Sequence, residues 1–175
     1  MNICIVSGYF NPIHPGHISM IQDVRRSYPT CELVVIVNND HQVTLKESIP
    51  FLDESARCEI VNNIKGVDYT VLSIDKDLSI AKTIESIVKN NRYKNYSIGQ
   101  KRIKFCNGGD RNLNSSNSQE LEICQKYDID IEYGYGGSKI YSSSNLIDNT
   151  YKYIIKNLFW KNIVKDLSTK LDIKA

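Results

Sequence analysis

The sequence lacks the features that would mark it as a membrane or nucleic-acid-binding protein. It has no apolar run of membrane-spanning length, and no signal peptide precedes its first apolar segment. The net charge of only +2 over 175 residues gives no sign of a nucleic-acid or lipid partner. Internal repeats, linkers and low-complexity segments are also missing. We therefore expect one soluble, cytoplasmic protein with neither a membrane nor a nucleic acid as partner.

The five cysteines form no C-x-x-C pair and have no regular spacing. Three of them fall inside apolar, strand-like runs, which is typical of buried free thiols. A chain with this pattern is expected in a reducing compartment rather than in a disulfide-bonded, secreted protein.

Strand-like and helix-like segments alternate along the chain, which is typical of an α/β protein. This alternation predicts a doubly wound, mostly parallel five-stranded sheet of Rossmann-like type with a C-terminal helix. We expect the domain to cover residues 1–150 and a helical extension of it to cover residues 151–175. The extension either packs back on the sheet or forms a dimer contact. The expected strands are residues 2–7, 31–37, 69–74, 102–106 and 129–133, and the expected helices are residues 16–28, 53–64, 79–88, 116–127, a segment from 142 or 143, and 151–173.

Sheets of this kind bind ligands at the carboxyl ends of their strands, near the point where the strand order reverses. The residues directly after each strand are therefore the first candidates for a site. Most of the glycines and several lone charges of the chain lie in these stretches. The five stretches are residues 8–17, 38–46, 73–77, 108–111 and 134–144.

Two of the three histidines, His14 and His17, lie at the first strand-to-helix junction. Pro15 suits the first turn of a helix, where its missing N–H is not needed. The N–H groups at a helix start point outward and carry partial positive charge, so they bind anions. Histidines three residues apart lie on one side of that turn and can reach the same phosphates. Two other interpretations are half of a metal site and a structural role.

Five segments resemble motifs of the cytidylyltransferase-like nucleotidyltransferases. The run G-Y-F-N-P-I-H-P-G-H over residues 8–17 resembles their G-x-F-D-x-x-H-x-G-H signature. Together the five segments follow the family's order and span residues 4–147. The other four are Val37 to Asp40 with Leu45-Lys46, Asp53 to Arg57 with Val67-Asp68, Gly108 to Asp110, and Ile140 to Ser144.

The resemblance implies transfer of CMP or AMP from CTP or ATP to a small phosphorylated alcohol or sugar, with release of pyrophosphate. It also implies Mg²⁺ as cofactor, without naming its ligands, and a homodimer. The implied catalytic residues are His14, His17 and Lys46. The implied nucleotide-binding residues are Gly8, Tyr9, Phe10, Gly16, Gly109, Asp110, Lys139, Ser142, Ser143 and Ser144, and the implied substrate-binding residues are Asn11, Asp40 and Arg57.

Two departures from the family pattern bear on the substrate. Asn11 stands where the signature has an aspartate, and residues 136–142 lack the arginine of the R-T-x-G-I-S-T pattern, for which Lys139 is a substitute. The S-S-x-N ending is closer to heptose-phosphate adenylyltransferases, so the nucleotide is either CTP or ATP. For Arg57 we expect either contact with the substrate or ordering of a loop. The alternative function is a non-catalytic, regulatory nucleotide-binding module on the same fold.

Overall fold

A computed structural model describes residues 2–90, 102–109, 112, 114, 116–137 and 142–170. The chain forms two compact units, residues 1–140 and 141–175. Two of the predicted nucleotide-binding residues, Asp110 and Lys139, lie outside the described residues.

The first unit contains a five-stranded sheet in the order β3-β2-β1-β4-β5, in which every pairing is parallel. The central strand β1 pairs on both sides, so that Ile5 lies opposite Val34 of β2 and Phe105 of β4. This topology confirms the predicted doubly wound, Rossmann-like sheet. The strands are β1 Asn2–Gly8, β2 Glu32–Val37, β3 Tyr69–Leu72, β4 Arg102–Gly108 and β5 Ile129–Tyr135.

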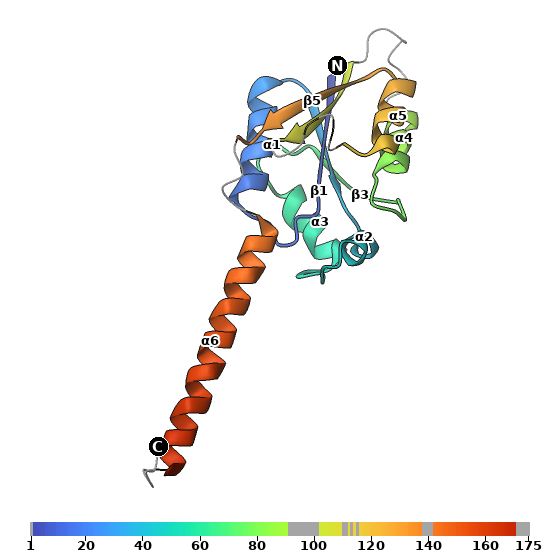
Figure 1. Cartoon of the computed structure of the whole chain (residues 1–175). Coiled ribbons are helices and arrows are strands. Elements are labelled where there is room, and N and C mark those ends of the chain that lie inside the picture. Colours follow the sequence, from blue (N-terminus) through green and yellow to red (C-terminus); the bar gives the residue numbers. More distant parts are fainter. Residues whose placement is uncertain are drawn as a thin grey trace. The chain divides into compact units, whose positions relative to one another are not determined.

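Helices cover both faces of the sheet because the side chains of β1 alternate between two apolar cores. Ile3 and Ile5 belong to the core that also contains residues of α4 and α5. Cys4 and Val6 belong to the core that contains residues of α1 and α3. Figure 1 shows α1 and the pair α4 and α5 on opposite sides of the sheet. The helices of this unit are α1 Pro15–Ser27, α2 Asp40–Leu45, α3 Glu54–Asn62, α4 Ala81–Lys89 and α5 Ser118–Lys126.

Helix α2 follows the second strand, where the sequence predicts no helix. Asn39 caps this helix, and its side-chain oxygen accepts a hydrogen bond from the N–H of Gln42 at 2.8 Å. The Gln42 side chain accepts the N–H of Asn39 in return, at 3.2 Å. This reciprocal pair is a capping box, and it provides two of the bonds that a helix start lacks. As a result, Lys46 lies at the C-cap of a helix rather than within an open loop.

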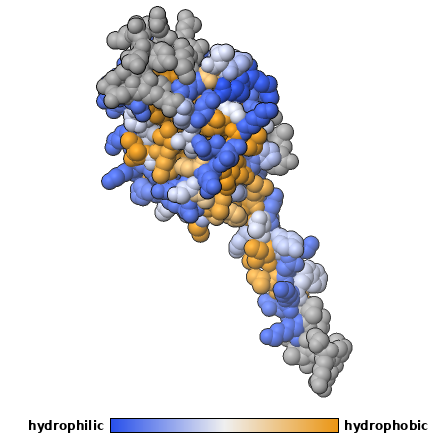
Figure 2. Space-filling view, turned by 180° about the vertical axis from the view of Figure 1, so that it is seen from behind, coloured by the Kyte–Doolittle hydropathy of each residue, from blue (hydrophilic) through white to orange (hydrophobic). Residues whose placement is uncertain are grey.

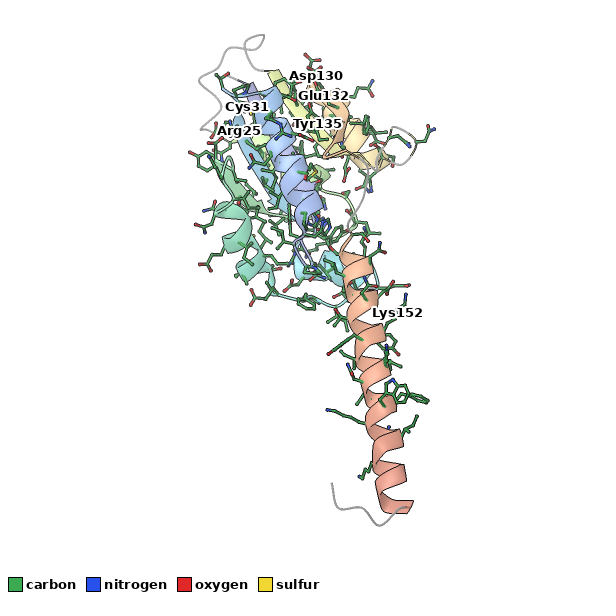
Figure 3. The ribbon with its side chains drawn as sticks, turned by 90° about the vertical axis from the view of Figure 1, so that its left-hand side faces the viewer. Arg25, Cys31, Asp130, Glu132, Tyr135 and Lys152 are labelled. Atoms are coloured by element: carbon green, nitrogen blue, oxygen red, sulfur yellow. The ribbon has the colours of Figure 1, made fainter. Side chains whose placement is uncertain are left out.

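A polar cluster on the β4 side of β1 links the end of α1 to β4 and β5. We call it the Glu132 network; its residues are Glu132, Tyr28, Tyr135 and Lys104. The Glu132 carboxylate accepts hydrogen bonds from the Tyr28 hydroxyl at 2.7 Å, from the Tyr135 hydroxyl, and from Lys104 Nζ at 2.5 Å. Burial raises the pKa of Glu132, but these donors outweigh it and hold the pKa below its ordinary value. Figure 3 labels Glu132 and Tyr135 on β5.

The described part of the second unit is one long helix, α6 Ser143–Lys170. The sequence predicts two helical segments here, whereas a single helix continues through both, and the expected domain boundary at residue 150 falls inside it. Apolar side chains such as Ile155 and Phe159 are exposed along α6, among polar ones (Figure 2). No helix in the described part of the chain is long and apolar enough to cross a membrane.

Candidate active site

The turn after β1 brings both histidines to the start of α1. His14 is the N-cap residue, Pro15 opens the helix, and the chain reaches them through Phe10, whose φ is +50°. The Phe10 ring is buried and lies 4.6 Å from the His17 ring, measured between centroids. A side chain on Gly8 would crowd the same ring, because a Cβ there would lie 3.1 Å from it. This turn therefore depends on a glycine and a buried aromatic side chain.

The two histidine rings form one unit. Their centroids are 3.8 Å apart and the rings are stacked at 25°. The N–H of His14 donates to Nδ1 of His17 at 3.3 Å. Because Nδ1 accepts, a neutral His17 ring carries its proton on Nε2, which makes that nitrogen a donor toward an anion. The predicted arrangement of both rings on one turn is present.

The Lys46 side chain reaches the same turn from the end of α2, the helix that follows the neighbouring strand β2. Its ammonium nitrogen lies 4.4 Å from the centroid of the Tyr9 ring, within the range of a cation–π contact. Tyr9 directly follows β1, and Lys46 ends the helix that follows β2. The parallel pairing of β1 and β2 therefore explains how two sequence segments 37 positions apart meet at one edge of the sheet.

Arg57 lies under this turn and does not face outward. Its side chain is 1% exposed, and its Nη1 donates to the carbonyl oxygens of Tyr9 at 2.6 Å and Asn38 at 2.7 Å. Nε donates to the carbonyl oxygen of Leu52 at 3.1 Å, and Nη2 pairs with Asp40 at 2.6 Å. We call these five residues the Arg57 network. Of the two roles expected for Arg57, these contacts support the ordering of loops.

Asp40 also makes contacts within the protein. One carboxylate oxygen pairs with Arg57, and the other accepts the N–H of Glu54 at 3.3 Å. The Glu54 carboxylate accepts the N–H of Asp40 in return, at 2.9 Å. The charged groups of Asp40 and Arg57 therefore bind each other and backbone groups near the starts of α2 and α3, and their assignment to substrate binding stays a prediction. Sequence spacing could not reveal these contacts, because the partners meet only in the fold.

Asn11 is buried as well, with 4% of its surface exposed. Its side-chain NH₂ donates to the carbonyl oxygen of Ile49 at 2.9 Å. Its side-chain oxygen accepts the N–H of Phe51 at 2.5 Å. Both polar atoms of the predicted substrate ligand thus bind the segment between α2 and α3.

The ends of β4 and β5 also approach each other. The N–H of Gly109 donates to the carbonyl oxygen of Tyr135 at 2.9 Å. A Cβ on Gly109 would collide with the carbonyl oxygen of Gly137, so this approach requires a glycine. The predicted G-G-D segment therefore serves close backbone packing at its second glycine, Gly109.

Comparison with known proteins identifies the family. A family described as cytidylyltransferase-like matches residues 5–162. The chain belongs to the cytidylyltransferase-like family. An FAD synthase of Korarchaeum cryptofilum is 40% identical over 87 residues, covering 49% of this chain and 55% of that protein. An FAD synthase of Methanopyrus kandleri is 32% identical over 83 residues, covering 46% and 55%.

Two further comparisons extend over more of the chain. The bifunctional protein HldE of Actinobacillus succinogenes is 32% identical over 114 residues, which is 62% of this chain and 23% of that protein. A lipopolysaccharide core biosynthesis protein of Thermoplasma volcanium has the same fold, with a TM-score of 0.54 at 21% identity over 76% of this chain and 94% of that chain. The matches to the FAD synthases span about half the length of those proteins.

Sequence reasoning missed two residues that shape this cytidylyltransferase-like site, Asn39 and Gln42. The Gln42 amide is fully buried and donates to the carbonyl oxygens of Asp77 and Ser79, at 2.7 and 2.6 Å. The Asn39 amide donates to the carbonyl oxygen of Ser73 at 2.9 Å. These bonds attach α2, and with it Lys46, to the segment after β3. The Asn-x-x-Gln capping pattern was the available signal.

Three further predicted nucleotide-binding residues, all serines, lie at the start of α6. Ser142 and Ser143 belong to the second unit, where the Ser142 hydroxyl accepts the N–H of Asn145 at 3.1 Å and so caps α6. Ser144 lies in the first turn of the same helix. Histidine, cysteine and carboxylate side chains do not gather in threes anywhere in the described residues, so these donors alone build no metal site.

Proposed function

We propose that this protein transfers a nucleotidyl group from a nucleoside triphosphate to a small phosphorylated acceptor and releases pyrophosphate. The observation that carries the proposal is the meeting of His14, His17 and Lys46 at one edge of the sheet. Two imidazoles and an ammonium group around a helix start are suited to a triphosphate. Membership of the cytidylyltransferase-like family supports the same chemistry.

In the proposed reaction an oxygen of the acceptor phosphate attacks the α-phosphorus of the nucleotide. The bond from that phosphorus to the bridging oxygen breaks, and pyrophosphate leaves with the electron pair. His14 and His17 donate hydrogen bonds to the α-phosphate oxygens, where negative charge increases. Lys46 neutralises charge on the incoming phosphate. No protein nucleophile is needed, because positioning and charge neutralisation suffice for this step.

The other predicted ligands complete the proposal. Gly16 allows the nucleotide to approach the backbone closely, Gly8 and Gly109 allow the close packing of the turns around it, and Tyr9 and Phe10 line the turn after β1. By the family resemblance, Ser142, Ser143 and Ser144 are assigned to phosphate binding, and Asp110 and Lys139 are assigned to the nucleotide. Mg²⁺ bound together with the nucleotide would neutralise phosphate charge and would need few ligands from the protein.

We propose ATP as the nucleotide and flavin mononucleotide as the acceptor. The relatives named FAD synthase support both choices, because FAD is flavin mononucleotide joined to AMP. The surface beside Lys46 also supports an acceptor with a flat apolar ring. Ile49 and Phe51 are 83% and 63% exposed there, and a ring system would cover apolar surface that a sugar phosphate would leave in water.

Incubation of the protein with Mg²⁺, ATP or CTP, and one of three acceptors tests this proposal. The acceptors are flavin mononucleotide, glycerol phosphate and a hexose or heptose phosphate, and pyrophosphate release is the readout. We expect release with ATP and flavin mononucleotide. If pyrophosphate is released only with a sugar or alcohol phosphate, flavin mononucleotide is not the acceptor. If the protein binds a nucleotide but releases no pyrophosphate with any acceptor, the result favours the alternative function, a regulatory nucleotide-binding module.

His17→Ala tests the catalytic assignment within the same assay. Removal of a donor that acts mainly in the transition state is expected to lower kcat by about a hundredfold to a thousandfold. Nucleotide binding should stay within about tenfold, or roughly 1.4 kcal/mol. His41→Ala is the matched control, because His41 is exposed on α2 and is expected to leave both values unchanged. A near-normal kcat in His17→Ala would remove His17 from the mechanism.

For the assembly we propose a homodimer that buries apolar side chains of α6. Ile155 and Phe159 are exposed on this helix, and a single helix cannot cover its own apolar side chains. Sedimentation of the full chain and of the variant with Ile155→Ser and Phe159→Ser measures the assembly. A monomer in both, or a dimer in both, would contradict a dimer formed through this helix.

A further inference from the structure

Residues 46–53 connect α2 to α3, and Lys46 is the first of them. The later part of this segment is bound by Arg57 of α3 and by Asn11 of the turn between β1 and α1. The Arg57 guanidinium binds the Leu52 carbonyl oxygen. Asn11 binds both sides of Pro50, through the carbonyl oxygen of Ile49 and the N–H of Phe51. We call this pair of Asn11 bonds the Asn11 clasp. It joins positions 38 and 40 residues apart in the sequence.

We propose that Asn11 is a positioning residue, which holds residues 46–53 so that Lys46 stays above the Tyr9 ring and toward the phosphates. This inference rests on the proposed function. Asn11 is 4% exposed, and both of its side-chain polar atoms bind backbone groups of this segment. Lys46 itself is exposed, and a long exposed lysine side chain loses considerable rotamer entropy when it is held in one place. A fixed backbone beneath it reduces the volume that its ammonium group explores.

The chemistry of the clasp requires an amide. One atom must donate to a carbonyl oxygen, and another must accept from an N–H, which an asparagine side chain does simultaneously. An ionised aspartate has only acceptors, so one of its oxygens would face the Ile49 carbonyl oxygen without a proton between them. A protonated aspartate restores both bonds, because its O–H donates and its C=O accepts. Asn11→Asp therefore converts the clasp into one that closes at low pH and opens at high pH.

The charged and titratable groups around this turn are Lys46 over Tyr9, Arg57 with its partner Asp40, and the pair His14 and His17. All of them are present in both the native protein and Asn11→Asp. The ratio of a measured value in Asn11→Asp to the same value in the native protein, taken at each pH, therefore isolates the effect of the introduced carboxyl group. Burial raises the pKa of a carboxyl group, so the change is expected to extend toward neutral pH.

Hydrogen exchange of the Phe51 amide and steady-state kinetics, each from about pH 5 to about pH 8, test the inference. In Asn11→Asp we expect native-like protection of Phe51 at low pH and at least tenfold lower protection than native at high pH. The kcat/KM of the variant for the acceptor should be within about threefold of native at low pH and at least tenfold below it at high pH. The dissociation constant for ATP should stay within about twofold. In Asn11→Ala, both the protection of the Phe51 amide and the kcat/KM for the acceptor should be low at every pH.

Each outcome decides one point. Protection that does not differ between Asn11→Asp and the native protein at any pH would overturn the clasp. Loss of protection with an unchanged kcat/KM ratio would show a structural role only and overturn the positioning role. Since exchange needs no turnover, the clasp is tested even if the proposed transferase reaction fails. Phe51→Pro provides a further variant, because it removes the N–H donor while leaving Asn11 intact. Phe51→Ala is its control, because it removes the same ring and keeps the N–H, so the kinetic loss in Phe51→Pro should exceed the loss in Phe51→Ala.

Discussion

The two polar networks of the first unit are built differently, although both link elements around β1. The Arg57 network has a cation at its centre, 1% exposed, and three of its four partners are backbone carbonyl oxygens. The Glu132 network has a carboxylate at its centre, 27% exposed, and its partners are side chains. The first network therefore fixes the path of the chain at the candidate site, whereas the second fixes how helix and strands pack.

This difference has a physical consequence. Backbone carbonyl oxygens do not titrate, and no substitution removes them, so three of the four contacts of the Arg57 network depend on the Arg57 side chain alone. A buried guanidinium that satisfies several carbonyl oxygens is costly to lose, because each oxygen is left without a donor. The Glu132 network depends on a charge state, because the carboxylate accepts its hydrogen bonds from Tyr28, Lys104 and Tyr135 together only when it is ionised.

The largest effect is expected from Arg57→Ala. Its loss leaves the carbonyl oxygens of Tyr9, Asn38 and Leu52 without this donor and Asp40 without its cation. We expect the free energy of unfolding to fall by about 3 kcal/mol, as for other broken buried ion pairs. Urea denaturation monitored by circular dichroism measures it.

Arg26→Ala is the matched control for that substitution. Arg26 pairs with Asp23 on α1, but its side chain is 70% exposed. Exposed ion pairs contribute little, so a change below about 0.5 kcal/mol is expected. Equal losses in the two variants would show that burial of Arg57 does not matter.

A smaller and pH-dependent effect is expected from Glu132→Gln. The amide weakens the charged hydrogen bonds of the network, and we expect a loss of about 1–2 kcal/mol near neutral pH. Because the pKa of Glu132 lies below its ordinary value of 4.5 in the folded protein, its contribution is present above that value. It is lost as the pH falls through the folded pKa, so the native protein and the variant should converge in acid. A difference that is independent of pH would exclude the charge of Glu132 as the cause.

The smallest effect is expected from the coupling between the networks. Arg57 and Glu132 share no hydrogen-bond partner in the described structure. The two losses in unfolding free energy should therefore add within about 0.5 kcal/mol in the double variant. A larger deviation in urea denaturation would mean that β1 transmits strain between the two sides.

Much of the fold could be predicted because its signals are local. Apolar runs of strand length and helical periodicity indicated the sheet, and the G-Y-F-N-P-I-H-P-G-H run indicated the histidine turn. Helix α2 was missed because its apolar content is small and its signal is the Asn39 and Gln42 capping pair. Asp40, Arg57 and Asn11 were assigned to substrate, because a polar side chain beside a binding turn looks the same in the sequence whether it faces a ligand or the protein.

The strand and helix alternation, the family motifs and the two histidines at a helix start could be predicted from the sequence, since each is carried by residues close together along the chain. The directions of the polar side chains depend on the folded structure. Asn11 and Arg57 are satisfied by carbonyl oxygens that lie 38 and 48 positions away. Buried polar groups must find partners wherever the fold supplies them, and backbone carbonyl oxygens carry no sequence signature.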